Sequence, residues 1–368
     1  MTDIQPTSAS AFRVLCRVLG GRDQGALAEC MNTALLPQLF SMAHSEDLLP
    51  ALAVRCNEQN IDLLAFGAER ADLLGRALVE NTRGNMEIIA QALKFTRELN
   101  RAGITPLFLK GTARLLSAEP QNLGFRKQVD VDLIVQPAEL EAAGDAFLAD
   151  GYSFCEFPDN TTAVPIKPGD TVSAIKLSAA HHHLPPLVKG SYAATVELHR
   201  HFLPRRFQRN NPLEPLFGSA KKAERHGATF YLPSTEYQLI HLLLGKVVHD
   251  GHLTRRTFPV REACDFIELL ENAGNDVDQR LVLQHCGRSF TLFHALVCEL
   301  MRYTPRSGIA DVESISKFTR TMQRRFESRV IRTSLDVYAR VEYLVHALTY
   351  TPAKLPAYLR RMVSSNDA

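Results

Sequence analysis

Two aspartates separated by one residue form the most informative pattern in the sequence. Asp130 and Asp132 lie in the run Val-Asp-Val-Asp-Leu-Ile-Val at 129–135. This alternation predicts a strand on which both carboxylates share one face, while its valines and its leucine point into the core. Neighbouring carboxylates repel each other, and a fold tolerates them when a cation lies between them. Because Mg²⁺ prefers carboxylate oxygens and shares its ligand shell with substrate phosphates, the pair predicts a catalytic metal site.

A third carboxylate would complete such a site. The run Val-Glu-Leu-His at 196–199 indicates another strand, in which Glu197 and His199 share one face. We therefore predict Glu197 as the third metal ligand and catalytic carboxylate. His199 either contacts the metal or substrate itself or orients Glu197 from behind, and the sequence leaves both roles open.

A phosphate-binding turn precedes the aspartate pair. The apolar run at 104–109 is followed by Lys110-Gly111-Thr112 and then by a helical stretch. Glycine at a strand-to-helix turn lets a phosphate approach the backbone, and the helix start offers free N–H groups. Thr112 adds a hydroxyl and Lys110 a charge. Because a lysine at the end of an apolar strand needs a partner, we expect Lys110 to bind a phosphate rather than to support the fold.

Other polar residues extend the candidate site. Arg126 either holds a phosphate or forms a salt bridge that orders Asp130, and the sequence does not choose between them. Lys246 either contacts a triphosphate tail or is an ordinary surface lysine. The three histidines at 181–183 cannot all face one ion, so we expect them in a loop that lines the pocket rather than at the metal.

The elements needed to position these residues are those of an α+β protein. Short apolar runs at 104–109, 129–135, 152–157, 172–177 and 194–199 predict strands, and the stretches between several of them predict helices. In the segments before residue 96 and after residue 210, apolar residues recur at helical spacing. We predict a mixed α/β catalytic core at 96–210 between an N-terminal helical region at 1–95 and a C-terminal helical region at 211–368.

Composition limits the class of protein. The chain has 368 residues, 45% of them hydrophobic and 22% charged, with a net charge of +2. Its seven cysteines form no Cys-x-x-Cys pair, which is typical of a reducing compartment. The first ten residues lack a signal peptide, and no apolar run reaches membrane-spanning length, so we expect a cytoplasmic protein without a membrane partner.

Positive charge gathers near the C-terminus. Residues 301–368 hold ten arginines, two lysines and six acidic residues. Helical spacing predicts one helix at 310–333 in which Arg325, Arg329 and Arg332 form a stripe. Such a stripe suits a phosphate-bearing partner. It equally fits a solvated surface with local ion pairs, and this alternative stays open.

Taken in order, these motifs resemble a known family. Leu-Lys-Gly at 109–111, an arginine just before Asp-x-Asp-Leu, a helix ending in Gly-Tyr at 151–152 and an acidic-Leu-His strand occur together over residues 104–203. The pattern resembles the uncharacterised bacterial nucleotidyltransferases of the polymerase-beta-type nucleotidyltransferase superfamily. The likeness is weaker through His241, His249 and Asp265. The superfamily pattern has Gly-Ser where this chain has Gly111-Thr112, and a third aspartate where it has Glu197.

The resemblance implies an enzyme and its site. It implies Mg²⁺ or Mn²⁺ and a nucleoside triphosphate, with transfer of a nucleotidyl group to a hydroxyl or phosphate. The acceptor stays open as a small molecule, peptide, protein or RNA. A toxin-like enzyme that modifies a protein or tRNA, and a catalytically silent nucleotide-binding module, are the alternatives. The nucleotide-binding residues expected are Lys110, Gly111, Thr112, Arg126 and Lys246.

Overall fold

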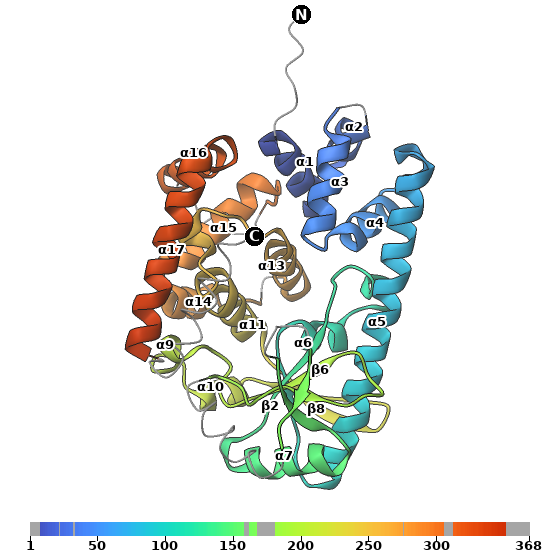
Figure 1. Cartoon of the computed structure of the whole chain (residues 1–368), viewed down its shortest axis with the longest axis vertical. Helices are drawn as coiled ribbons and strands as arrows, with labels where there is room; N and C mark the ends of the chain where they lie inside the picture. The colour runs from blue at the N-terminus through green and yellow to red at the C-terminus, as the bar shows by residue number, and fades with distance from the viewer. Residues whose placement is uncertain are drawn as a thin grey trace, which may run out of the picture.

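A computed structural model of the chain describes residues 8–21, 23–31, 34–157, 162–167, 181–274, 276–304 and 312–350. Its architecture is a mixed sheet with helices on both faces (Figure 1). The mixed α and β content agrees with the predicted α+β class. The predicted strand at 172–177 lies outside the described residues.

The central strands of the sheet carry the predicted site. The strand order is β4-β3-β5-β6-β2-β1-β8-β7, and β2 pairs with β6 in parallel so that Asp132 lies opposite Glu197. The bounds are β1 Leu107–Phe108, β2 Asp130–Ile134, β3 Ser153–Glu156, β4 Val164–Pro165, β5 Leu187–Val188, β6 Thr195–His199, β7 Lys221–Arg225 and β8 Ala228–Leu232. The predicted strands at 129–135 and 194–199 are therefore confirmed, apart from Val129, which was expected in the core but is 63% exposed just before β2 begins.

The two faces of the sheet pack against different helices. Odd-numbered residues of β2, such as Leu133, join a core with α5 (Ala68–Arg101) and α7 (Leu140–Ala149). In that core the Phe95 ring lies 5.0 Å from the Phe147 ring, centroid to centroid. The even-numbered Ile134 instead joins the core of the remaining helices. Alternation along β2 thus places the acidic residues on the face toward that second layer of helices.

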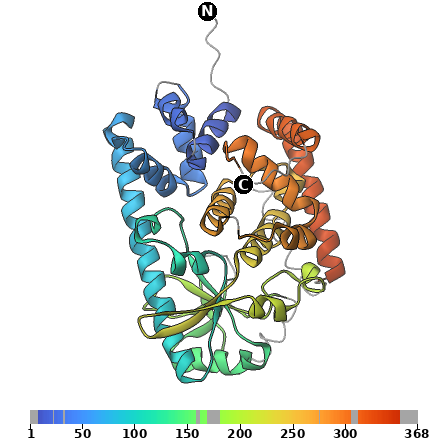
Figure 2. The same ribbon diagram turned by 180° about the vertical axis from the view of Figure 1, so that it is seen from behind.

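The N-terminal and C-terminal helices form one layer above the sheet (Figures 1 and 2). Leu15 and Leu19 of α1 share its core with Phe266 of α13 and Phe293 of α15. A β-carbon on Gly20 would lie 2.1 Å from the Met301 carbonyl oxygen, so α1 needs this glycine where it meets the end of α15. The bounds are α1 Ser8–Gly20, α2 Gln24–Met31, α3 Leu36–Ser45, α4 Leu49–Glu58, α6 Lys110–Ser117, α9 Arg205–Gln208, α10 Leu213–Gly218, α11 Thr235–Leu242, η6 Leu243–Val248, α12 His252–Arg255, α13 Val260–Ala273, α14 Gln279–Cys286 and α15 Arg288–Leu300.

The short strands β4 and β5 and the hairpin of β7 and β8 were not predicted. Strands β7 and β8 form an antiparallel hairpin at 221–232, within the stretch that was expected to be helical. β8 adds to the sheet by pairing in parallel with β1. The sheet therefore extends beyond residue 210, and the division of the chain at 95 and 210 stays a prediction.

The basic C-terminal stripe is interrupted. The predicted single helix at 310–333 is wrong, because α16 (Val312–Glu327) ends before α17 (Arg329–Tyr350) begins. Arg325 turns back to Asp336 of α17, with 3.0 Å between Nη1 and Oδ1. Arg332 is exposed, and the side chain of Arg329 lies outside the described residues. The arginines of 320–332 therefore sit on two helices instead of one face.

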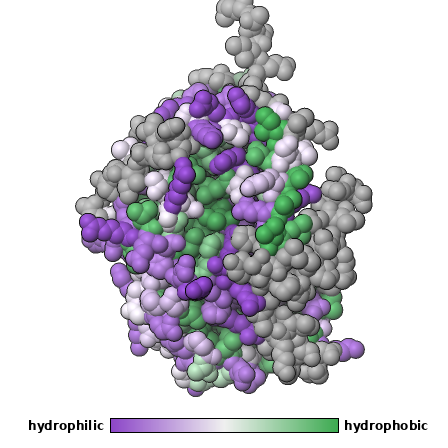
Figure 3. Space-filling model, turned by 90° about the vertical axis from the view of Figure 1, so that its left-hand side faces the viewer, coloured by the Kyte–Doolittle hydropathy of each residue, from purple (hydrophilic) through white to green (hydrophobic). Residues whose placement is uncertain are grey.

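The exposed side of α17 is mixed in character. Its exposed large hydrophobic residues are Val337, Tyr338, Val341 and Val345. Figure 3, which views the molecule from the α16 and α17 side, shows hydrophobic patches beside hydrophilic ones. Across the described residues, no helix combines the length and the apolar character needed to span a membrane.

Candidate active site

Four side chains meet where β2 and β6 run side by side. Asp132 and His199 are fully buried, with 2.9 Å between Asp132 Oδ1 and His199 Nε2. Glu197 Oε2 lies 3.5 Å from His199 Nε2. The ammonium of Lys110 contacts Asp132 Oδ1 and lies 3.3 Å from Glu197 Oε2. The parallel register explains the cluster, because it sets Asp132 beside Glu197 and leaves His199 two residues further along the same face.

Three of these residues could hold a metal ion. Asp132, Glu197 and His199 each offer a ligand atom, and these atoms all lie within 4.8 Å of one another. Asp132 Oδ2 is buried without a hydrogen-bond partner. A buried carboxylate oxygen without a donor is costly, so it fits a position made for a cation. The group includes His199, for which the sequence left both a metal contact and an orienting role open, and Asp130 is not part of it.

Asp130 lies at the start of the same strand, in a different environment. Gln128 Nε2 donates to Asp130 Oδ1 at 2.6 Å and to the Asp130 carbonyl oxygen at 2.9 Å. Burial and the neighbouring Asp132 raise the pKa of the Asp130 carboxyl to about 6, although Lys110 pulls it down. The sequence analysis did not single out Gln128, since a glutamine two residues before an aspartate carries no recognisable motif.

Opposite charges shift the pKa values of three side chains in the buried cluster. Burial alone would lower the pKa of the Lys110 ammonium, but Asp132 and Glu197 raise it above its usual range. Burial likewise pushes the Glu197 pKa upward, yet Lys110 and the His199 hydrogen bond hold it below its usual range. Burial and Lys110 depress the His199 pKa, and its bonds to Asp132 and Glu197 outweigh them and raise it. Lys110 also adopts a φ of +50°, which non-glycine residues rarely do.

The predicted histidine loop lies beside this cluster. The rings of His182 and His183 pack against the His199 ring, with centroids 5.2 Å and 5.5 Å away. Burial and the charge of His199 push the His182 pKa well below its usual value, and burial also lowers that of His183. The neutral rings of His182 and His183 pack against the imidazole of His199 and hold it in position.

The turn residues contribute differently from one another. Thr112 is 1% exposed, and its Oγ1 accepts a hydrogen bond from the Asp132 amide at 3.1 Å. It thus fixes the backbone of β2 from behind, while its contact with nucleotide stays a prediction. Gly111 lines the cavity, and a β-carbon there would lie 1.8 Å from Gln128 Oε1 and 2.7 Å from Arg126 Nη1. Glycine is needed here because two side chains occupy the space.

Arg126 is paired with the helical layer. Its Nε donates to Asp265 Oδ2 of α13 at 2.9 Å, and Arg114 Nη2 donates to the same oxygen at 2.7 Å. Arg126 Nη1 also donates to Gln128 Oε1. Of the two predicted roles of Arg126, the ordering of Asp130 runs through Gln128 and not through a direct salt bridge, and the phosphate contact stays a prediction.

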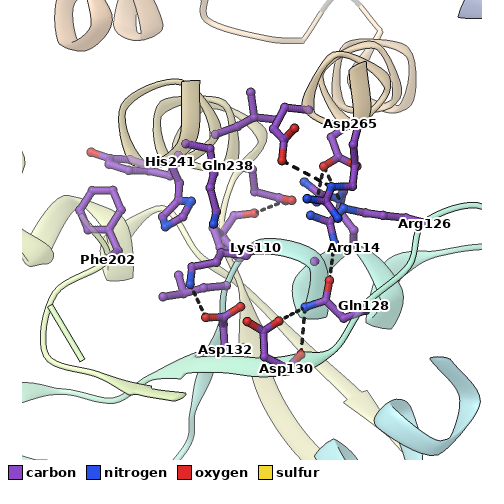
Figure 4. Close-up of a pocket in the computed structure, with 18 of the residues that line it drawn as sticks. Lys110, Arg114, Arg126, Gln128, Asp130, Asp132, Phe202, Gln238, His241 and Asp265 are labelled. Atoms are coloured by element: carbon purple, nitrogen blue, oxygen red, sulfur yellow. Dashed lines mark hydrogen bonds and ion pairs between the residues drawn. The ribbon is translucent and has the colours of Figure 1, made fainter. Parts of the chain in front are cut away.

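A cavity between the sheet and the helical layer is lined by Lys110, Asp130 and Asp132 among others, whereas Glu197 and His199 are not among its lining residues (Figure 4). It encloses about 150 Å³ and opens to solvent. Figure 4 shows His241, Gln238 and Phe202 on the side opposite Asp130 and Asp132. Lys246 also lines the cavity, on the segment η6, where its ammonium is 4.0 Å from Asp250 Oδ2.

The chain matches one family model. A family model described as "Uncharacterised nucleotidyltransferase" matches residues 34–300. The chain belongs to this nucleotidyltransferase family. The match spans the acidic cluster, the Lys110 turn and α13, and it ends before α16 and α17. Family membership supports a general role in nucleotidyl transfer, and no curated protein matches the chain.

Gly111→Ala should destabilise the protein. The added methyl group would force the ends of Gln128 and Arg126 to move and to lose hydrogen bonds, or would displace α6. We expect a loss of about 1–3 kcal/mol in the free energy of unfolding, measured with denaturant. Gly75→Ala on α5 is the control, because no atom lies within 4 Å of a β-carbon there and alanine should favour the helix. Equal stability of Gly111→Ala and the wild type would contradict the packing described.

Proposed function

We propose that the protein is a metal-dependent nucleotidyltransferase that moves a nucleotidyl group from a nucleoside triphosphate to a hydroxyl or phosphate acceptor. The observation that carries the proposal is the Asp132–Glu197–His199 group with its unpartnered Asp132 Oδ2, next to an open cavity that Asp132 and Lys110 line. Family membership gives the reaction class. The cytoplasm is the expected place of action.

The donor set suits a divalent metal. Asp132 and Glu197 supply carboxylate oxygens, which Mg²⁺ and Mn²⁺ prefer, and His199 supplies an imidazole nitrogen, which favours a transition metal. Mn²⁺ therefore fits this mixed set better than Mg²⁺. Asp130 lies within the same cavity and is the expected further ligand once a triphosphate is present. When bound, the metal would activate the acceptor oxygen and neutralise charge on the phosphates.

Other residues around the metal position would bind the triphosphate and the base. The turn at 110–112 would hold the triphosphate, with Lys110 as its cation, and Lys246 lies at the solvent side of the cavity. Phe202 and Tyr237, with ring centroids 5.9 Å apart, offer an apolar wall to the base. Because the enclosed volume is below the roughly 300–1,000 Å³ of most ligand pockets, part of the nucleotide would extend toward solvent.

The proposed reaction is an in-line displacement. The acceptor oxygen forms a bond to the α-phosphorus, and the bond from that phosphorus to the oxygen bridging to the β-phosphate breaks. Pyrophosphate leaves with those bonding electrons, and the acceptor proton passes to a carboxylate of the cavity. Positioning and charge neutralisation supply most of the rate enhancement in such transfers.

Labelled triphosphates test the proposal. Cell extract is incubated with the protein, Mn²⁺ or Mg²⁺, and each of the four triphosphates labelled at the α-phosphate or at the γ-phosphate. We expect the α-label to appear on an acceptor and the γ-label to appear in pyrophosphate. Transfer of the γ-label to an acceptor would instead show phosphoryl transfer. Nucleotide binding without any transfer would favour the catalytically silent module.

A further inference from the structure

Gln128 bridges a cationic side chain and a catalytic carboxylate. It is 9% exposed, and both ends of its amide are engaged. Its oxygen accepts from Arg126 Nη1, and its nitrogen donates to Asp130 Oδ1 at 2.6 Å and to the Asp130 carbonyl oxygen at 2.9 Å. A guanidinium only donates, so the amide oxygen must face Arg126 and the NH₂ group must face Asp130. The orientation of Gln128 is therefore fixed by the chemistry of its neighbours.

The chain of contacts continues into the helical layer. Arg126 Nε donates to Asp265 Oδ2 of α13, and Asp265 is 2% exposed. Asp265 also accepts from Arg114 at 2.7 Å, so it is held from two sides. The absence of a side chain at Gly111 leaves the room that Gln128 occupies. Three successive hydrogen bonds thus connect α13 of the helical layer to the first residue of β2 (Figure 4).

We infer that Gln128 is a positioning residue that aims the Asp130 carboxylate into the cavity. It holds Oδ1 of Asp130 and leaves the other oxygen for the metal or the substrate. Arg126 and Asp265 hold Gln128 in turn. The position of α13 relative to the sheet is therefore coupled to the orientation of the Asp130 carboxylate. This inference rests on the proposed function of the same cavity. Residues that orient metal ligands typically change metal affinity or activity by about 10–100-fold when replaced.

Two replacements separate positioning from packing. Gln128→Glu keeps the length and an oxygen that accepts from Arg126, but it cannot donate to Asp130 and brings a negative charge beside it. Gln128→Met keeps the length and loses both contacts. If Gln128 serves only to fill space and hold Arg126, the Glu variant should behave like the wild type. If it positions Asp130, both variants should be impaired.

The experiment measures turnover, binding and stability together. We expect kcat to fall about 10–100-fold in both variants. KM for the triphosphate should change by less than about threefold, since Lys110 and the turn are untouched, and the melting temperature of each variant shows how much of the loss in kcat reflects unfolding. Gln121→Glu, an exposed change in the same loop, is the matched control and should leave all of these unchanged. A Glu variant with the wild-type kcat would overturn the inference.

A second measurement needs no turnover. Mn²⁺ affinity in the presence of a non-hydrolysable triphosphate is followed by electron paramagnetic resonance in the wild type and Gln128→Met. We expect the variant to bind Mn²⁺ about 10–100-fold more weakly. If the wild type transfers no nucleotidyl group yet the variant loses Mn²⁺ affinity, the proposed function fails and the role of Gln128 stands. Unchanged Mn²⁺ affinity together with unchanged kcat would overturn the role of Gln128.

Discussion

Asp132→Asn is expected to lower the rate of nucleotidyl transfer by about 10³-fold, the scale of removing a central electrostatic group from an active site. Asp132 contacts Lys110 and His199 and carries the unpartnered buried oxygen of the metal group. The amide that replaces it keeps the shape, loses the charge and turns an NH₂ group toward one neighbour. The rate is measured as pyrophosphate release at saturating Mn²⁺ and triphosphate. Asp145→Asn, on an exposed position of α7, is the control.

The same substitution should also cost stability. From repulsion between carboxylates alone, removal of one charge would hold or raise stability. The structure changes that expectation, because Asp132 is paired with a cation and a histidine that its loss would leave short of partners. We expect a decrease of about 1–3 kcal/mol in the free energy of unfolding. Wild-type turnover by the Asp132→Asn protein would show that Asp132 is not a catalytic residue.

Lys110→Met is expected to change two affinities in opposite directions. The Lys110 ammonium lies against Asp132 and Glu197, the carboxylates that a metal would use, so it would compete with the metal when no nucleotide is bound. Its removal should tighten Mn²⁺ binding to the nucleotide-free protein. The same removal should weaken triphosphate binding by about 1–3 kcal/mol, the scale of a lost charge-assisted hydrogen bond. We expect that, in the wild type, a bound triphosphate draws Lys110 from the carboxylates and leaves them free for the metal.

Calorimetry resolves the two effects. Mn²⁺ is titrated into the wild type and Lys110→Met with and without a non-hydrolysable triphosphate, and the triphosphate is titrated separately. Lys317→Met, an exposed lysine on α16, is the matched control. Weaker Mn²⁺ binding by nucleotide-free Lys110→Met would show that the ammonium supports the metal group instead of competing with it. Unchanged triphosphate affinity with a much lower melting temperature would make Lys110 a structural ion-pair partner.

Local patterns predicted the parts of the site that depend on strand alternation. The spacing of Asp130 and Asp132, and of Glu197 and His199, places each pair on one face in any strand, and the structure keeps this arrangement. The turn at Lys110 was also visible, because glycine after an apolar run marks a strand-to-helix junction. These features need only a few neighbouring residues, so the sequence contains them directly.

Contacts between distant segments were not predictable in the same way. The Arg126–Asp265 pair joins residues 139 positions apart. Which residue pairs with Arg126 depends on how α13 packs against the sheet. Gln128 gains its role only from that pair and from the room beside Gly111. The sequence predicted one helix over 310–333, although the helix is interrupted at Ser328 between α16 and α17. The helical spacing of the arginines continues across Ser328, so the sequence pattern gives no sign of the interruption. Tertiary packing decides such cases, and periodicity reports only one element at a time.

The most direct test of the catalytic centre is a crystal structure with Mn²⁺ and a non-hydrolysable triphosphate, with the ion located by its anomalous signal. We predict an anomalous peak about 2.1 Å from Asp132 Oδ2, the usual distance for a small divalent cation. Glu197 or His199 should supply a second ligand, and the Lys110 ammonium should lie on the triphosphate. A bound triphosphate with no peak at Asp132, and with Lys110 still on its carboxylates, would contradict the proposed centre.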